Sequence, residues 1–141
     1  MSTEISPRLL AIVEALPLGR DMRVLEIGCG PGAMAREMAR RVGAGKVVAI
    51  DRSAKAIAQA VAGSADDIAA GRLEFRQSAI ETFELEPGEA PFDIAVAVRV
   101  GALDGRHPEA GIKARAAIGR ALKPGGRLFI DDGPSVREIG L

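Results

Sequence analysis

The chain has 141 residues, is 48% hydrophobic with only 3% aromatic residues, and carries 19 basic and 19 acidic side chains. This length predicts a single domain, residues 1–141, with one core built mainly from aliphatic side chains. The zero formal net charge argues against a broad attraction to nucleic acid or to an anionic membrane, and the single cysteine excludes an intramolecular disulfide. A cytoplasmic location is expected, because the amino terminus lacks a signal-peptide pattern and no apolar run approaches the roughly 20 residues that span a membrane.

Helices and strands are predicted to alternate along the chain. Ser6 as a cap, Pro7 at the first helical position and apolar side chains at helical spacing predict a first helix over residues 6–16. The segment 78–90 is predicted to be irregular, residues 123–126 to form a tight turn, and residues 132–141 to form a short tail. Apolar runs predict strands at 24–27, 46–51, 72–77, 92–98 and 127–131, with helices at 32–42, 52–61 and 107–122. This alternation predicts an α/β fold with a parallel sheet covered by helices.

The stretch from Val24 to Gly32 organises the chain as a buried strand, a glycine-rich turn and the start of a helix. Because glycine lacks a Cβ, glycines at alternate positions let the backbone turn sharply and approach a ligand closely. Asp51 ends the next strand, about 20 residues downstream, where a carboxylate accepts hydrogen bonds from the hydroxyl groups of a ribose. Turn and acid together predict an adenosine-containing cofactor, and a nicotinamide dinucleotide has to be considered.

Three features argue against the dinucleotide. Glu26 lies two residues before the first glycine, where a carboxylate meets a ligand ammonium group but repels a pyrophosphate. Pro31 removes an amide donor that a pyrophosphate would use. The chain has about five predicted strands, whereas a dinucleotide domain is usually built from two mononucleotide-binding halves. A nicotinamide-binding oxidoreductase is therefore the less favoured reading.

Four segments resemble the successive motifs of class I S-adenosylmethionine-dependent methyltransferases: Val24–Gly32, Val48–Asp51, Phe92–Val96 and Leu122–Leu128. They stand in the family's order and cover about residues 20–131. The resemblance implies a Rossmann-like, doubly wound parallel sheet with strand order 3-2-1-4-5. It also implies an enzyme that binds S-adenosylmethionine at the carboxyl ends of the strands, transfers the methyl group in line to an acceptor, and releases S-adenosylhomocysteine.

The resemblance assigns cofactor contacts residue by residue. The methionine part is expected at Glu26, Gly28, Cys29, Gly30 and Gly32, the ribose at Asp51, the adenine beside Arg52, Ser78, Ala79 and Ile80, and the methyl group near Val98 and Arg99. Many relatives have an acid where this chain has Gln77 and Ser78, so adenine recognition is expected to use backbone groups or Ser78. No metal site is predicted.

The sequence determines the residues that act on the acceptor less well. Arg99 either binds an anionic acceptor or pairs with a nearby carboxylate, and Cys29 is interpreted as a small packing residue rather than a nucleophile. His107 is alternatively an exposed loop residue, and Arg36 is interpreted as part of a solvated helix face. The candidate bases, for an acceptor that must lose a proton, are Asp104, His107, Asp131 and Asp132.

A small molecule is the favoured acceptor. No N-P-P-Y-type motif follows the fourth strand, and the chain has no Trp or Tyr to form a base-stacking platform. The alternative class of function is a non-catalytic module that binds S-adenosylmethionine or a partner and has kept only the cofactor half of the fold.

The end of the chain departs from the family pattern. Full-length relatives usually continue after the fifth strand with a helix and two strands, and this chain ends about ten residues after Ile130. The sixth and seventh strands are therefore expected to be missing, which leaves the strand 127–131 as an open edge. An open edge predicts a homodimer with that side or the tail at the interface. The substrate pocket is then expected to use the first helix and the loop from Val98 to His107.

Overall fold

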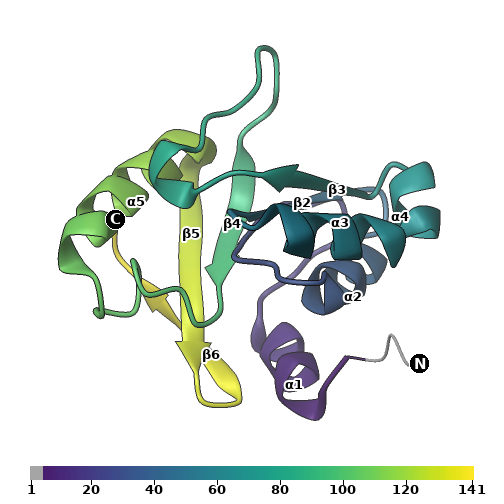
Figure 1. The fold of residues 1–141 in the computed structure, drawn as a ribbon, viewed down its shortest axis with the longest axis horizontal. Coiled ribbons are helices and arrows are strands. Elements are labelled where there is room, and N and C mark those ends of the chain that lie inside the picture. The colour runs from purple at the N-terminus through teal and green to yellow at the C-terminus, as the bar shows by residue number, and fades with distance from the viewer. Residues whose placement is uncertain (1–4) are drawn as a thin grey trace.

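The computed structural model of the protein describes residues 5–141 (Figure 1). No helix within this range is long and apolar enough to cross a membrane. The elements are, in chain order, α1 (Pro7–Ala15), β1 (Arg23–Ile27), α2 (Ala33–Arg41), β2 (Lys46–Asp51), α3 (Ala54–Ala62), α4 (Ala65–Ala69), β3 (Leu73–Gln77), the 3-10 helix η1 (Ile80–Thr82), β4 (Phe92–Ala97), α5 (Pro108–Ala121), β5 (Leu122–Asp132) and β6 (Ser135–Ile139).

The strands form one sheet in the order β3-β2-β1-β4-β5-β6. β1 pairs in parallel with β2 and with β4, so Leu25 lies between Val48 on one side and Ala95 on the other. All three side chains are completely buried, as expected for parallel strands that are covered on both faces. The predicted α/β fold and the predicted order 3-2-1-4-5 are confirmed.

Helices cover the two faces of the sheet and enclose two clusters of buried side chains (Figure 1). α1 and α2 close the first cluster, in which Ile12 and Met38 are completely buried. α5 and η1 close the second cluster, which contains Ile118. Side chains of a strand alternate between the two faces, and Val24 of β1 belongs to the first cluster. Glu26, two residues further on, therefore points to the face that α1 and α2 cover.

Two helices start at serine caps that the sequence indicates. The Ser6 hydroxyl accepts a hydrogen bond from the Leu9 amide at 3.2 Å, with Pro7 at the first helical position of α1. The Ser53 hydroxyl accepts from the Ala56 amide at 3.1 Å at the start of α3. Each cap satisfies a backbone donor that has no partner inside the helix.

The last residues correct two expectations. Part of the predicted tail forms β6, which pairs antiparallel with β5 and places Ile139 opposite Leu128. The expectation that no sixth strand forms is therefore wrong, and so is the expectation that strand five is an open edge, because β6 covers it. Gly133, with a φ of 60°, and Pro134 lie between the paired residues Asp132 and Ser135 and reverse the chain.

β5 also begins earlier than predicted. Leu122 lies opposite Phe92, and the next paired residue, Arg127, lies opposite Ile94. The four residues between them leave the regular ladder, with Gly125 at a φ of 81°. The predicted turn at 123–126 is thus an irregularity within the longer strand β5, because the chain pairs with β4 both before and after these residues.

Candidate functional site

The glycine-rich turn follows β1 at the edge of the sheet where the parallel strands end. Gly28, Gly30 and Gly32 have φ angles of 73°, 53° and 93°, which side-chain-bearing residues rarely adopt. A Cβ on Gly32 would lie 3.0 Å from Phe75 Cζ and 3.1 Å from Ala60 Cβ. A Cβ on Gly30 would meet no heavy atom within 4 Å. Gly32 therefore serves the packing of α2, whereas Gly30 faces open space.

Successive amides of this turn already donate hydrogen bonds inside the protein. The amides of Gly28 and Cys29 donate to the Ile50 carbonyl at 2.8 and 2.9 Å. The Gly30 amide donates to Asp51 Oδ2 at 2.9 Å. A pyrophosphate binds at such a turn through free amide donors, so this geometry opposes the nicotinamide dinucleotide.

Glu26 is buried at the end of β1 and incompletely satisfied. Its side chain is only 3% exposed, and among residues 5–141 its Oε1 atom has no hydrogen-bond partner. Burial, with a smaller contribution from the nearby Asp51 charge, raises the pKa of Glu26 from 4.5 to about 8, and Arg36 opposes this rise. An unsatisfied buried polar group costs about 1–3 kcal/mol. A ligand ammonium group fits this carboxyl, because it supplies both a donor and a counter-charge.

Glu26 lies in a cavity of about 340 Å³ between the glycine-rich turn and the start of α1, here called the Glu26 cavity. Arg8 and Arg99 also line it, while Leu9 and Met34 supply apolar surface. One cavity thus presents a carboxyl group and two guanidinium groups. This combination suits a ligand that carries both an ammonium group and a carboxylate.

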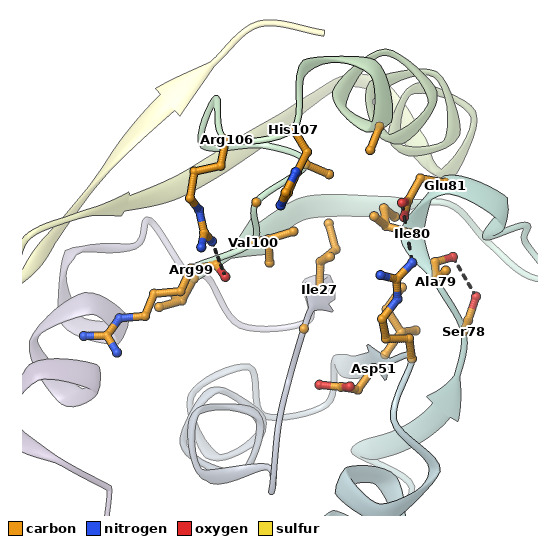
Figure 2. A pocket seen from close by; sticks show the side chains of 17 residues that line it. Ile27, Asp51, Ser78, Ala79, Ile80, Glu81, Arg99, Val100, Arg106 and His107 are labelled. Atoms are coloured by element: carbon orange, nitrogen blue, oxygen red, sulfur yellow. Dashed lines mark hydrogen bonds and ion pairs between the residues drawn. The ribbon is translucent and has the colours of Figure 1, made fainter.

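A second cavity, of about 520 Å³, follows the ends of β2, β3 and β4 and is here called the Asp51 cavity. Figure 2 shows Asp51 and Ser78 on one side of it and Arg106 and His107 on the other. The two cavities meet, because three residues line both of them: Gly28, Val98 and Arg99.

Asp51 joins the end of β2 to the glycine-rich turn. Its Oδ2 accepts from the Gly30 amide and its Oδ1 from the Ser53 amide, each at 2.9 Å. A carboxylate has about four acceptor positions, so lone pairs remain for two further donors such as ribose hydroxyl groups.

The residues predicted for adenine border the same cavity. The Ser78 hydroxyl donates to the Ala79 carbonyl at 3.0 Å, which leaves its oxygen available as an acceptor. Ile80 is 4% exposed and adds apolar surface. Arg52 is mostly exposed and lies 3.6 Å from Glu81, so this ion pair links the end of β2 to η1 (Figure 2).

Asp131, a predicted base, is engaged by two partners. Its Oδ1 accepts from the Arg99 amide and its Oδ2 from Arg8 Nη2, each at 3.0 Å. Arg99 has a φ of 57°, an uncommon value for a residue other than glycine. Arg106 Nη2 donates to the Arg99 carbonyl at 3.1 Å. Asp131 and Arg106 thus hold the Arg99 backbone from both sides, which is the geometry of a positioning residue rather than of a base.

The other three predicted bases differ in their access to the cavities. His107 borders the Asp51 cavity at the start of α5, and Gly101 makes room for its imidazole. Asp104 accepts from Arg106 Nε at 2.9 Å, a bond that lowers the pKa of Asp104. Asp132 is exposed and borders neither cavity. His107 is thus the one of the four that borders a cavity without being held by an arginine.

Cys29 lies within the glycine-rich turn, and Arg36 lies in the helix that follows it. Cys29 is 7% exposed, and burial raises the pKa of its thiol, which favours packing over nucleophilic attack. Arg36 is half-buried, and its Nη1 donates to the Pro31 carbonyl at 3.0 Å and to the Ser64 hydroxyl at 2.9 Å. The interpretation of Arg36 as part of a solvated face is therefore wrong, because it braces the glycine-rich turn.

Sequence reasoning assigned no role at the site to three arginines: Arg8, Arg36 and Arg106. Arg36 follows Gly32 by one helical turn, and this spacing was a usable signal. Arg8 and Arg106 belong to no motif, and only the folded chain brings them to the site.

A doubly wound parallel sheet with a glycine-rich turn after its first strand and an acid after its second is the class I methyltransferase architecture. The methyltransferase domain family matches residues 24–126, and the chain belongs to this family. A trans-aconitate 2-methyltransferase from Streptomyces avermitilis is 35% identical over 89 residues, which make up 62% of this chain and 31% of that protein.

Solved structures show the same fold. A SAM-dependent methyltransferase from Thiobacillus denitrificans, in complex with S-adenosyl-L-homocysteine, has a TM-score of 0.68 at 23% identity, covering 92% of this chain and 49% of that one. The [4+2]-cyclase SpnF has a TM-score of 0.70 at 27% identity, covering 92% of this chain and 47% of that one. The chain therefore spans about half the length of these structures and about a third of the curated relative.

Proposed function

We propose that the protein binds S-adenosylmethionine and transfers its methyl group to a small-molecule acceptor. The observation that carries this proposal is the buried carboxyl of Glu26, which has an unsatisfied Oε1 and belongs to a residue that lines the same cavity as Arg8 and Arg99. The amino-acid part of S-adenosylmethionine has an ammonium group and a carboxylate that match this wall. Membership of the methyltransferase domain family supports the same cofactor.

Each part of the cofactor has a matching group in the chain. Arg8 is suited to the carboxylate, and Asp51 to the ribose hydroxyl groups. Ser78, Ala79 and Ile80 are suited to the adenine, with Arg52 at the rim. The contacts proposed for the ammonium group and the rest of the methionine part are Glu26, Gly28, Cys29, Gly30 and Gly32. Val98 and Arg99 are proposed to border the methyl group on the side of the acceptor.

When bound, S-adenosylmethionine supplies a methyl group that is already strongly electrophilic, so the chain contributes mainly by positioning the reactants and excluding water. Arg99 stands where the two cavities meet and is suited to orient an acceptor. His107 is suited to accept a proton from an acceptor that must lose one. Asp131 is proposed to position Arg99 by accepting a hydrogen bond from its amide. Asp132 is the weakest of the predicted catalytic residues, because it borders neither cavity.

Calorimetry tests the cofactor directly. S-adenosylhomocysteine is expected to bind, and NAD is expected not to bind, because the amides of the turn that a pyrophosphate would use are already engaged. Binding of NAD without binding of S-adenosylhomocysteine would reverse the proposal.

A non-catalytic module that binds S-adenosylmethionine is the second proposal. It is favoured by the arginines that pair with two of the predicted bases, Asp104 and Asp131. Formation of S-adenosylhomocysteine with a panel of small acceptors separates the two functions. Cofactor binding without turnover on any acceptor supports the module.

We also propose that residues 1–141 form a single domain and that the protein is a cytoplasmic homodimer. On the side of the sheet proposed for the dimer interface, the edge strand is β6, because β6 covers β5. Light scattering at micromolar concentration tests the dimer, and a monomer there contradicts it.

A further inference from the structure

Three arginines, with His107 beside them, gather where the two cavities meet. Arg99 lines both cavities, Arg106 and His107 line the Asp51 cavity, and Arg8 lines the Glu26 cavity. Figure 2 shows Arg99, Arg106 and His107 on the side opposite to Asp51. The acceptor side of the site is therefore distinct from the side that suits the ribose.

The three arginines of this group share only two carboxylates. Arg8 pairs with Asp131 at 3.0 Å, and Arg106 pairs with Asp104 at 2.9 Å. Asp131 accepts from the backbone amide of Arg99 rather than from its side chain. Within the part of the chain that the structure describes, the Arg99 guanidinium forms no salt bridge, so it is the cation available to a ligand.

Two hydrogen bonds hold the backbone of Arg99 in place. A left-handed conformation at a residue other than glycine persists only where its surroundings impose it. Here Asp131 fixes the amide and Arg106 fixes the carbonyl. Figure 2 shows the Arg99 side chain extending away from Asp51. The guanidinium is thus presented from a defined position at the junction of the cavities.

The charge of the proposed cofactor decides what this arginine binds. The sulfonium joins the adenosine part to the amino-acid part, so it belongs near the residues shared by the two cavities. The sulfonium and the exposed Arg99 guanidinium carry like charges, and a neutral acceptor leaves both of them uncompensated. An anionic acceptor compensates both.

We propose that the acceptor is a carboxylic acid, bound as its anion by Arg99, whose carbonyl Arg106 holds in place. This inference rests on the proposed methyl transfer and names the class of its acceptor. Arginine suits this role because its planar guanidinium matches the two oxygens of a carboxylate.

The engaged state of the nearby acids agrees with such an acceptor. In transfer to a carboxylate oxygen, an oxygen lone pair forms the new C–O bond while the C–S bond breaks and its electrons remain on sulfur. The products are a methyl ester and S-adenosylhomocysteine, and no proton has to be removed. Asp104 and Asp131 are both paired with arginines, so neither is free to act as a base, and this acceptor requires none.

The test measures release of S-adenosylhomocysteine with a panel of dicarboxylic and tricarboxylic acids, including trans-aconitate, beside the neutral amides of the same carbon skeletons. Turnover is expected with at least one acid and with none of the amides. Arg99→Gln is expected to raise KM for that acid about 10- to 100-fold, the loss of a charge-assisted hydrogen bond. Arg106→Gln is expected to raise KM by a smaller factor, because it removes only the hydrogen bond that holds the Arg99 carbonyl. Arg99→Lys should restore part of the affinity. Arg120→Gln, on the exposed side of α5, is the matched control and should leave KM unchanged.

Calorimetry with S-adenosylhomocysteine on the same variants identifies which carboxylate Arg99 holds. An unchanged cofactor affinity in Arg99→Gln supports the acceptor. A cofactor affinity that falls tenfold while KM for the acid stays constant assigns Arg99 to the carboxylate of the cofactor and overturns the inference. The inference also fails if the wild-type chain binds S-adenosylhomocysteine but uses amides as well as acids, or uses no acid at all. A wild-type chain that does not bind S-adenosylhomocysteine refutes the proposed function itself.

Discussion

Replacement of Glu26 by Gln removes the titratable group from the Glu26 cavity while keeping its size. In the wild-type chain, burial raises the pKa of Glu26 to about 8. Below that pH the carboxyl is mostly protonated, so binding of a ligand ammonium group must first ionise it. The affinity for S-adenosylhomocysteine should therefore rise about tenfold per pH unit below pH 8, and at pH 6 it should lie about 100-fold below its plateau.

Calorimetric titration from about pH 6 to pH 8 in two buffers of different ionisation enthalpy measures both the affinity and the protons released. The wild-type chain should release close to one proton at the acidic end and far less at the basic end. Glu26→Gln should bind about 1.5–3 kcal/mol more weakly at the basic end and show a flat profile. Glu138→Gln on β6, where Glu138 pairs with Arg127 at the surface, should keep the wild-type profile.

The same variant alters folding. The pKa of Glu26 is higher in the folded chain than its ordinary value of 4.5, so between these values the folded chain retains a proton that the unfolded chain has lost. The free energy of unfolding should thus fall as pH rises through this window, by up to about 1.4 kcal/mol per pH unit, and level off above it. Urea titrations of wild type and Glu26→Gln measure this difference. A wild-type affinity that is constant below pH 8, or a Gln variant with the wild-type slope, refutes the assigned role of Glu26.

Four other substitutions test separate parts of the site. Asp51→Ala should weaken S-adenosylhomocysteine binding by about 1.5–3 kcal/mol in calorimetry, and an unchanged affinity removes Asp51 from the site. In urea titrations Gly32→Ala should lose about 1–3 kcal/mol because its Cβ meets packed side chains. Gly30→Ala should lower the free energy of unfolding by only about 1–2 kcal/mol, through its backbone conformation, yet it should also weaken cofactor binding. A larger loss of stability in Gly30→Ala than in Gly32→Ala contradicts this interpretation. Asp131→Asn should lower turnover without changing the shape of the pH–rate profile, whereas loss of the acidic limb identifies Asp131 as a base.

The predictable part of the site consists of residues next to strand ends. Glu26 and Asp51 follow from local pattern, because a buried strand, a glycine-rich turn and an acid about 20 residues later place these groups at one edge of a parallel sheet. The alternation of helices and strands indicates the parallel sheet, whereas the strand order 3-2-1-4-5 comes from the resemblance to the family. What the pattern does not contain is the protonation of Glu26, which depends on how completely the surrounding helices bury it.

The unpredicted part depends on contacts between distant segments. Arg8 and Asp131 are 123 residues apart and meet only when α1 lies against the end of β5. His107 gives no sequence signal of cavity access, because its position depends on where α5 starts relative to Gly101. β6 has only five residues and carries Arg137 and Glu138, so it lacks the apolar run that marks the buried strands.

The Arg8–Asp131 ion pair joins two distant segments of the chain beside the Glu26 cavity. Closing a loop of this length costs about 4 kcal/mol of chain entropy, whereas a partly exposed ion pair contributes about 1 kcal/mol or less. The ion pair therefore cannot drive the closure, and it forms only after the sheet has brought the two segments together. Ile12 and Val13 anchor the second half of α1 in the core, so the first turn around Arg8 is the part that separates at least cost. The position of Arg8 at the Glu26 cavity therefore depends on the packing of Ile12 and Val13 rather than on the ion pair with Asp131.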